Sequence, residues 1–540
     1  MSDVRVRIRV CLTALLLILL LARYSPGQVS RKAPVATINV TSRLVYLDVT
    51  VVDKSGRPVV KGLTLDDFLI TEDKRPQRIF SFEGPDAHTP NPDREADDTV
   101  GKAPVTIFVL DLLNSSSADF AYIRIEVEKY LNAQPAQLAV PCEIMVLGNQ
   151  SLEMVQGYTR NREDLLSALH HVPAALPYKM NAPFNSERFI QSVSALQQIA
   201  LQNKGIPGRK NIVWVGHGSP DIGAADEGDV IGKSPEWVSR YMRHTTDLLV
   251  DARITLFVLY LSVCEGLPCD ALKEAAEFAT EATLTQRGGD PFSGGLNFGV
   301  FINDTGGKLF FNRNDVAGEI KDSQELGSNY YTLTYQPQEN PVEDTFRHIR
   351  VTVRNRDLRV ITKTGYYPPE PVGTIESQRH VITDINEAAL SSVPLQNLKM
   401  TLGSVVRHPD TGTAEFIVDL GLKDLTWQQN EEGKSTASLR LAAVCMTAQR
   451  GIAASKLERV TVQSPTEDAL LRSKYITRVS LSLRLPRSTK NVRIVMQTLE
   501  GGRLGSVDLD RKTIDAAPAS PTPEPTLIVH PIRRMPQGKP

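Results

Sequence analysis

The chain has 540 residues, of which 41% are hydrophobic and 23% charged, and its formal net charge is −1. That length exceeds one ordinary hydrophobic core and predicts about three domains. The composition is typical of a globular protein and excludes a disordered or fibrous chain. The near-neutral charge offers no basic surface for nucleic acid.

The N-terminal segment is typical of an export signal. Arginines precede an apolar run from Val10 to Ala22 that is too short for a comfortable membrane span. Ser25 and Gly27 then stand at the −3 and −1 positions of a cut before Gln28. We therefore predict a signal peptide over residues 1–27 and an exported protein that is periplasmic, on the outer surface or secreted. The alternative is an uncleaved anchor, and only through it would the chain meet a membrane.

Residues 36–83 alternate apolar and polar positions and contain turn signals at Gly56 and Gly62, which predicts a small N-terminal β unit. Residues 84–103 are polar and rich in Pro and Asp, as expected of a linker.

Near-continuous apolar segments alternate with amphipathic segments in residues 104–367. This pattern predicts an α/β fold, a mostly parallel sheet with helices on both faces. Because ligands bind such sheets at the carboxyl ends of the strands, we expect Asp111, residues 216–221 and the loop at Cys264 on one rim. The expected strands are 105–111, 140–148, 211–216, 254–261 and 308–312, and the expected helices are 119–133, 161–172, 186–205 and 234–252.

The C-terminal third changes character again. Short β-branched or apolar runs separated by turn residues predict a β-sandwich-like domain over residues 375–515. Residues 516–540 form a Pro-rich tail that we expect to be extended.

Four cysteines follow the predicted signal. Cys264 and Cys269 are candidates for a disulfide in an oxidising compartment, since their spacing is not that of a CxxC redox motif and no histidine cluster accompanies them to form a zinc site. Cys142 and Cys445 lie in strand-like apolar runs and are expected to be small core residues.

Several long segments resemble a von Willebrand factor type A domain and, more narrowly, the VWFA-related acidobacterial-type family. In that family a β segment similar to residues 51–73 precedes the domain, and a strand pair similar to residues 346–368 closes it. The resemblance covers roughly residues 40–367 and implies a Rossmann-like sheet. The segments that carry it are "VTIFVLDLLNSSSADF" (105–120), "GYTRNREDLLSAL" (157–169), "GRKNIVWVGHGSPD" (208–221) and "TGGKLFFNRNDVAGEIKDSQELGSNYYTLTYQP" (305–337).

The resemblance also implies a divalent cation such as Mg²⁺, held by an Asp-x-Ser-x-Ser loop together with a Thr and an Asp on neighbouring loops. Asp111 and Ser115 match that loop, but Leu113 replaces a serine. Thr159 is the candidate for the threonine. The expected aspartate is missing directly after "NIVWV", and Asp221 follows several residues later, so the candidate metal site is degenerate.

An alternative interpretation needs no metal. Mg²⁺ requires near-octahedral oxygen geometry, so a missing hydroxyl and carboxylate would have to be replaced by Asn114 or Asp221. Otherwise Asp111 and Ser115 orient their loop by bonding nearby backbone N–H groups, and Asp119 caps the following helix.

The sequence favours a binding module over an enzyme. It has no phosphate-binding GxxxxGK[ST] loop, and the residues around Ser219 do not have the G-x-S-x-G spacing of a hydrolase. We predict that the protein binds a protein, or a cell-envelope or extracellular partner, through a rim that includes Asn114, Ser116, His217 and Ser219. The alternatives are a metal-dependent adhesion protein with an atypical site, a hydrolase, and a structural envelope component.

Overall fold

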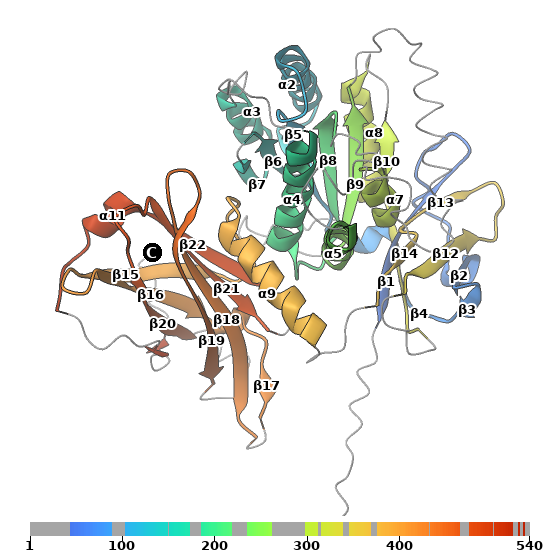
Figure 1. Cartoon of the computed structure of the whole chain (residues 1–540). Helices are drawn as coiled ribbons and strands as arrows, with labels where there is room; N and C mark the ends of the chain where they lie inside the picture. Colours follow the sequence, from blue (N-terminus) through green and yellow to red (C-terminus); the bar gives the residue numbers. More distant parts are fainter. Residues whose placement is uncertain are drawn as a thin grey trace, which may run out of the picture. The chain divides into compact units, whose positions relative to one another are not determined.

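The computed structural model describes fourteen stretches of the chain (Figure 1), and the predicted signal peptide, Ser219, Asp221, Cys264 and Cys269 lie outside them. Within these stretches no helix has the length and apolar character that a membrane crossing requires. The described residues are 44–88, 103–149, 151–172, 185–218, 235–261, 298–310, 315–337, 345–368, 375–430, 433–464, 475–499, 502–521, 528–529 and 533–534.

The central part is a six-stranded sheet in the order β10-β9-β8-β5-β6-β7, in which β7 alone is antiparallel to its neighbour. This confirms the predicted α/β fold with a mostly parallel sheet. The expected strands and helices are all present, whereas β7, α7 and α8 were not predicted. The strands are β5 (Val105–Asp111), β6 (Gln137–Leu147), β7 (Leu152–Asn161), β8 (Lys210–Gly216), β9 (Ile254–Tyr260) and β10 (Lys308–Phe310).

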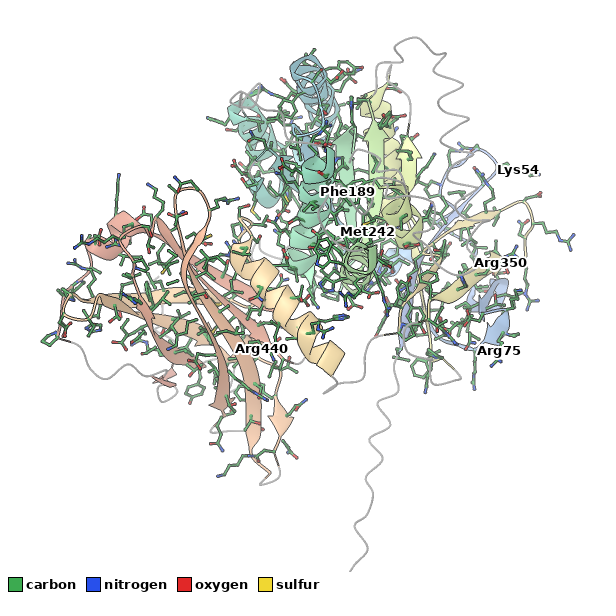
Figure 2. All side chains as sticks on the ribbon, viewed as in Figure 1. Lys54, Arg75, Phe189, Met242, Arg350 and Arg440 are labelled. Atoms are coloured by element: carbon green, nitrogen blue, oxygen red, sulfur yellow. The ribbon has the colours of Figure 1, made fainter. Side chains whose placement is uncertain are left out.

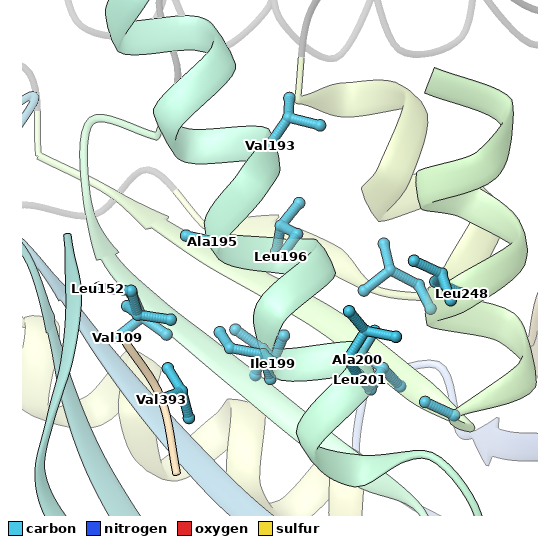
Figure 3. Packing of buried hydrophobic residues seen from close by; sticks show 14 of the residues in the cluster. Val109, Leu152, Val193, Ala195, Leu196, Ile199, Ala200, Leu201, Leu248 and Val393 are labelled. Carbon is cyan, nitrogen blue, oxygen red and sulfur yellow. The ribbon is translucent and has the colours of Figure 1, made fainter. Parts of the chain in front are cut away.

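Helices cover both faces of this sheet because its strands are apolar on both sides. Ile107 and Val109 of β5 pack on one face in the core formed with α4, α5 and α7, and Figure 3 shows part of this core. Phe108 and Leu110 pack on the other face with α2, α3 and α8. The helices are α2 (Ser117–Asn132), α3 (Arg162–His171), α4 (Asn185–Asn203), α5 (Pro235–Asp251), α7 (Gly299–Thr305) and α8 (Val316–Ser328).

The N-terminal strands do not form a sheet of their own, although β2 and β3 pair as a hairpin. Strands β1, β2 and β4 pair with strands from residues 331–366, which the sequence analysis placed in the central domain. The two four-stranded sheets β13-β1-β11-β4 and β14-β12-β2-β3 share one core. The segments are β1 (Val45–Val52), η1 (Leu65–Asp67), β2 (Phe68–Glu72), β3 (Arg75–Gln77), β4 (Ile79–Glu83), η2 (Pro85–His88), β11 (Tyr331–Tyr335), β12 (Arg347–Val353), β13 (Arg359–Ile361) and β14 (Gly365–Tyr366).

Antiparallel sheets make up the C-terminal part, as its strand pattern predicted, and they share one apolar core. A helix that was not predicted, α9 (Ile375–Leu390), precedes them and contributes Ile385 and Ala388 to the core of the central sheet. The segments are β15 (Met400–His408), β16 (Thr413–Gly421), η4 (Leu422–Asp424), β17 (Gln428–Gln429), β18 (Ser435–Met446), β19 (Ile452–Gln463), β20 (Tyr475–Arg484), β21 (Asn491–Thr498), β22 (Leu504–Asp510), α11 (Arg511–Asp515), β23 (Ile528–Val529) and β24 (Arg533–Arg534).

The cysteines that the structure describes behave as small core residues. Cys142 lies in the core beneath α2 and α8, Cys445 lies in the C-terminal core, and both are free thiols. Burial raises the pKa of the Cys142 thiol to about 12, so it is unreactive at neutral pH. The prediction for these two residues is confirmed.

Candidate functional site

Asp111 ends the central strand β5, with β6 and β8 on either side. The chain turns immediately, because the backbone N–H groups of Leu112 and Leu113 both donate to the Leu147 carbonyl at the end of β6. The Asp111 side chain is 0% exposed. A buried carboxylate requires hydrogen-bond donors or a cation.

The Asp111 carboxylate accepts hydrogen bonds from N–H groups of the protein. The Asn114 backbone N–H donates to Asp111 Oδ1 at 2.9 Å, and Asn114 Nδ2 lies 3.0 Å from each carboxylate oxygen. The indole Nε1 of Trp214, on β8, donates to Oδ2 at 3.0 Å. Burial raises the pKa of Asp111, and the bonds from Trp214 and Asn114 oppose that shift. The alternative in which loop N–H groups bond Asp111 and Ser115 therefore agrees with the structure for Asp111, whereas Ser115 Oγ has no partner among the described residues.

Helix α4 holds the other side of this network. Arg188 Nε donates to Asn114 Oδ1 at 3.0 Å, and Asn114 Nδ2 donates to Ser192 Oγ at 3.0 Å. Ser192 Oγ in turn donates to the Arg188 carbonyl at 2.9 Å. Asn114 thus links the Asp111 carboxylate to the Arg188 guanidinium, and its amide orientation is fixed by partners on both sides.

Gly216 explains why no aspartate follows β8 directly. A β-carbon at this position would lie 2.5 Å from Asp111 Cβ, which is closer than real side chains approach. The backbone at Gly216 also has a φ of +148°, where glycine is favoured. The close approach of β8 to Asp111 therefore excludes a side chain where the resemblance would place a metal ligand.

Thr159 does not belong to this site, which corrects its assignment as a metal ligand. Thr159 lies on β7 and pairs with Cys142 of β6, which pairs in turn with Thr106 near the start of β5. Asp111, at the end of β5, instead pairs with Leu147 at the end of β6. The pairing position of Thr159 is therefore five residues away from Asp111 along β5, which is about 16 Å at roughly 3.3 Å per residue. Because β7 is antiparallel, its threonine lies toward the amino end of the sheet, where its hydroxyl donates to Asp164 Oδ2.

The start of α2 lies on the rim beside the Asp111 loop. Ser116 is its N-cap: Ser116 Oγ accepts from the Asp119 backbone N–H at 3.1 Å and donates to Asp119 Oδ2 at 2.7 Å. The cap is therefore Ser116 rather than Asp119, and the Asp119 carboxylate accepts from the Ser116 hydroxyl. His217, half-buried, donates from Nε2 to the Leu261 carbonyl at 2.8 Å, and this nitrogen is 3.6 Å from Asp119 Oδ2.

The described residues do not form an oxygen cage for a hard cation. Of the three predicted ligands that the structure describes, Asp111 and Ser115 lie together and Thr159 does not. Both oxygens of Asp111 already accept N–H bonds. Mg²⁺ takes about six oxygen ligands in near-octahedral geometry. Within the described ranges no group of three or more His, Cys, Asp or Glu side chains could hold a metal ion. Ser115 Oγ is nevertheless buried with no hydrogen-bond partner among these residues.

Three residues of the network escaped sequence analysis: Trp214, Arg188 and Ser192. Trp214 stands two positions before Gly216 on the same strand, so the period-2 pattern places it on one face with Gly216. Arg188 and Ser192 are four residues apart on α4 and share one helix face. These spacings are visible in the sequence, but the partner strand and helix are not.

No family model matches the chain, and no curated protein matches it. Solved structures that resemble part of it include a VWA domain. The SpRpn10 VWA domain is 21% identical, covering 30% of this chain and 75% of that one, with a TM-score of 0.19. The conserved hypothetical protein BatB from Bacteroides thetaiotaomicron is 13% identical (41% and 96% covered, TM-score 0.24). Manganese-loaded TRAP protein from Plasmodium vivax is 9% identical (50% and 96% covered, TM-score 0.25).

Proposed function

We propose that the protein is an exported binding module that recognises a protein or cell-envelope partner through the rim at the carboxyl ends of its central strands, without a metal ion. One observation carries the metal-independent part of this proposal. Both oxygens of the Asp111 carboxylate are bonded to N–H groups of Asn114 and Trp214, so the protein itself stabilises the charge that a cation would otherwise balance.

Binding, rather than catalysis, is the function that the rim supports. Its described polar groups are tied into the structure: Ser116 caps α2, His217 donates to a backbone carbonyl, and Asn114 is held from two sides. Base-assisted catalysis needs a free proton acceptor within hydrogen-bond distance of a nucleophile. A rigid polar rim around a buried network offers instead a fixed surface for recognition.

A metal-dependent adhesion protein is the second candidate, and the buried, unbonded hydroxyl of Ser115 favours it. A cation would give that oxygen a partner. It would also have to displace the Asn114 amide from the Asp111 carboxylate, because Nδ2 lies 3.0 Å from both oxygens.

A photo-cross-linking side chain on the rim tests both candidates. Ala118, exposed in the first turn of α2, accepts the probe without loss of a hydrogen bond, and exposed Gln137 at the amino end of β6 is the matched control. On intact cells of the source organism we expect discrete adducts from position 118, the same with and without EDTA, and none from position 137. Adducts that vanish in EDTA would establish the metal-dependent alternative. Equal adducts from both positions, or none from position 118, would refute recognition by the rim.

A further inference from the structure

Strand β18 lies between β19 and β21, and its side chains alternate between two faces of the sheet. Leu439 and Leu441 pack in the C-terminal core, whereas Ala442 and Val444 pack on the opposite face with α9. Arg440, labelled in Figure 2, is on the same face as Ala442, because side chains two residues apart on a strand point the same way. It is half-buried and stands next to the covered apolar positions.

A second arginine faces Arg440 from the neighbouring strand. Arg459 of β19 is its direct partner in the antiparallel pairing, and Gln497 of β21 is its partner on the other side. Side chains of such a pair begin about 4.5–5.5 Å apart on one face, and like charges placed opposite each other destabilise a sheet. This row of three residues therefore carries two positive charges and no negative one.

The described part of the chain does not compensate these charges. Arg440 Nη1 is buried with no hydrogen-bond partner, and so is Gln497 Oε1. Arg459 Nη2 donates to the Ser438 hydroxyl at the long distance of 3.5 Å, and among the described residues neither arginine forms an ion pair. Burial lowers the pKa of Arg440, and the charge of Arg459 adds to this shift. The surroundings of Arg440 thus disfavour its positive charge.

Another arginine on the same face of the sheet has the partners that this row lacks. Arg493 of β21 is 1% exposed, and its Nη1 donates to the two carboxylate oxygens of Asp508 at 3.1 and 2.9 Å. Its Nε donates to the Ala388 carbonyl at 3.0 Å. Within one sheet, then, Arg493 has a carboxylate from the chain itself, whereas the described chain provides none for Arg440 and Arg459.

An apolar side chain adjoins the arginine pair. Leu457 stands two residues from Arg459 on the same face of β19, and it is 46% exposed. A ligand that matches both features carries an anionic group with an apolar group beside it. An acidic side chain next to an apolar one in a protein has this chemistry, and a carboxylate accepts charge-assisted bonds from guanidinium groups. Free phosphate has only the charge.

We propose that Arg440 and Arg459 form a recognition site for a carboxylate of a partner protein, on an acidic side chain with an apolar residue beside it. The carboxylate accepts from Arg440 Nη1 and from the Arg459 guanidinium, and the apolar neighbour covers Leu457. The site lies on the C-terminal sheet and not at the strand ends of the central sheet. Its test is therefore independent of the test of recognition by the rim.

Thermal unfolding of the full chain with short peptides tests this assignment. The peptide acetyl-Leu-Asp-Leu-amide supplies the carboxylate and its apolar neighbours, and acetyl-Leu-Asn-Leu-amide is the matched control without the charge. A ligand that binds only the folded state raises the midpoint. At constant ionic strength we expect a rise with the Asp peptide alone, and about tenfold or more weaker binding by Arg440→Gln. Arg350→Gln, which removes an exposed arginine from β12, should keep the wild-type response.

Gln497→Glu supplies a negative charge from within the chain. The new carboxylate lies in the row of Arg440, so the midpoint should exceed that of the wild type, and the Asp peptide should raise it no further. The matched control is Gln463→Glu, exposed on the same face of β19 and four residues from Arg459, which should keep the response to the peptide.

Three results would overturn the proposal. The first is an equal effect of the Asp and Asn peptides on the wild type. The second is a response to the Asp peptide that Arg440→Gln or Gln497→Glu retains in full. The third is a midpoint that rises with inorganic phosphate but not with the Asp peptide, which would show that the arginines select a tetrahedral anion and that the partner is not an acidic protein segment.

Discussion

Replacing Asp111 with Ala probes the network at the end of β5. The change leaves the Asn114 backbone N–H and Trp214 Nε1 without their acceptor, while Asn114 Nδ2 keeps Ser192 Oγ. A buried donor left unsatisfied costs about 1–3 kcal/mol, so two cost roughly 2–6 kcal/mol. The mutation also removes a buried carboxylate, whose desolvation is unfavourable and raises the pKa of Asp111. Removing it offsets part of the lost stability. We expect a net loss of about 2–4 kcal/mol in the free energy of unfolding.

Urea unfolding followed by far-ultraviolet circular dichroism measures this loss, and a double-mutant cycle identifies its origin. Trp214→Phe keeps an aromatic side chain, smaller than the indole, but removes the donor, so it should cost less when Asp111 is already Ala. A coupling energy of about 1–3 kcal/mol is expected. A cost below about 0.5 kcal/mol for Asp111→Ala, or strictly additive changes, would refute the proposed network.

Titration with millimolar Mg²⁺ and Mn²⁺ extends the same experiment. An ion bound to the folded state alone raises the melting midpoint in proportion to the logarithm of its concentration. We expect no rise in wild type or in Asp111→Ala. A rise in wild type that the mutant lacks would restore metal-dependent adhesion.

Two further substitutions test buried contacts of the central sheet. Burial raises the pKa of Glu143 to about 8, although the hydrogen bond from Gln202 opposes this shift. The folded protein therefore binds the Glu143 proton more tightly than the unfolded chain does. The stability that this proton contributes is fully present below about pH 4.5 and is lost as the pH rises through 8. Urea unfolding at pH 5 to 8 should show the wild type losing up to roughly 1.4 kcal/mol per pH unit relative to Glu143→Gln, and a constant difference between them would contradict the assigned protonation. Gly216→Ala should lower the free energy of unfolding by more than about 2 kcal/mol, because its β-carbon meets Asp111 at 2.5 Å in a strained conformation. In the control Gly218→Ala, the nearest atom to the new β-carbon is 3.4 Å away, so the loss of stability should be clearly smaller. Thermal unfolding measures both variants. A lower midpoint for Gly218→Ala than for Gly216→Ala would show that contact with Asp111 is not what excludes a side chain.

Local pattern was sufficient for the elements of the central sheet. Each expected strand is apolar on both faces and each expected helix is amphipathic, so periodicity alone separates them. The same pattern placed Asp111 at a strand end beside Gly216, because parallel strands end at one edge. Cys142 and Cys445 were assigned to cores on the same grounds, since both lie inside apolar runs.

Tertiary structure decided what pairs with what. The strands of residues 45–83 complete their sheets with residues 331–366, a pairing across the whole central domain that no local pattern encodes. Thr159 was misplaced because β7 runs antiparallel, and strand direction depends on the connection rather than on composition. The donors that satisfy Asp111 come from β8 and from its own loop, and Arg188 reaches the network from α4. Sequence shows the carboxylate at the strand end, but only the packing of these elements shows that N–H groups surround it.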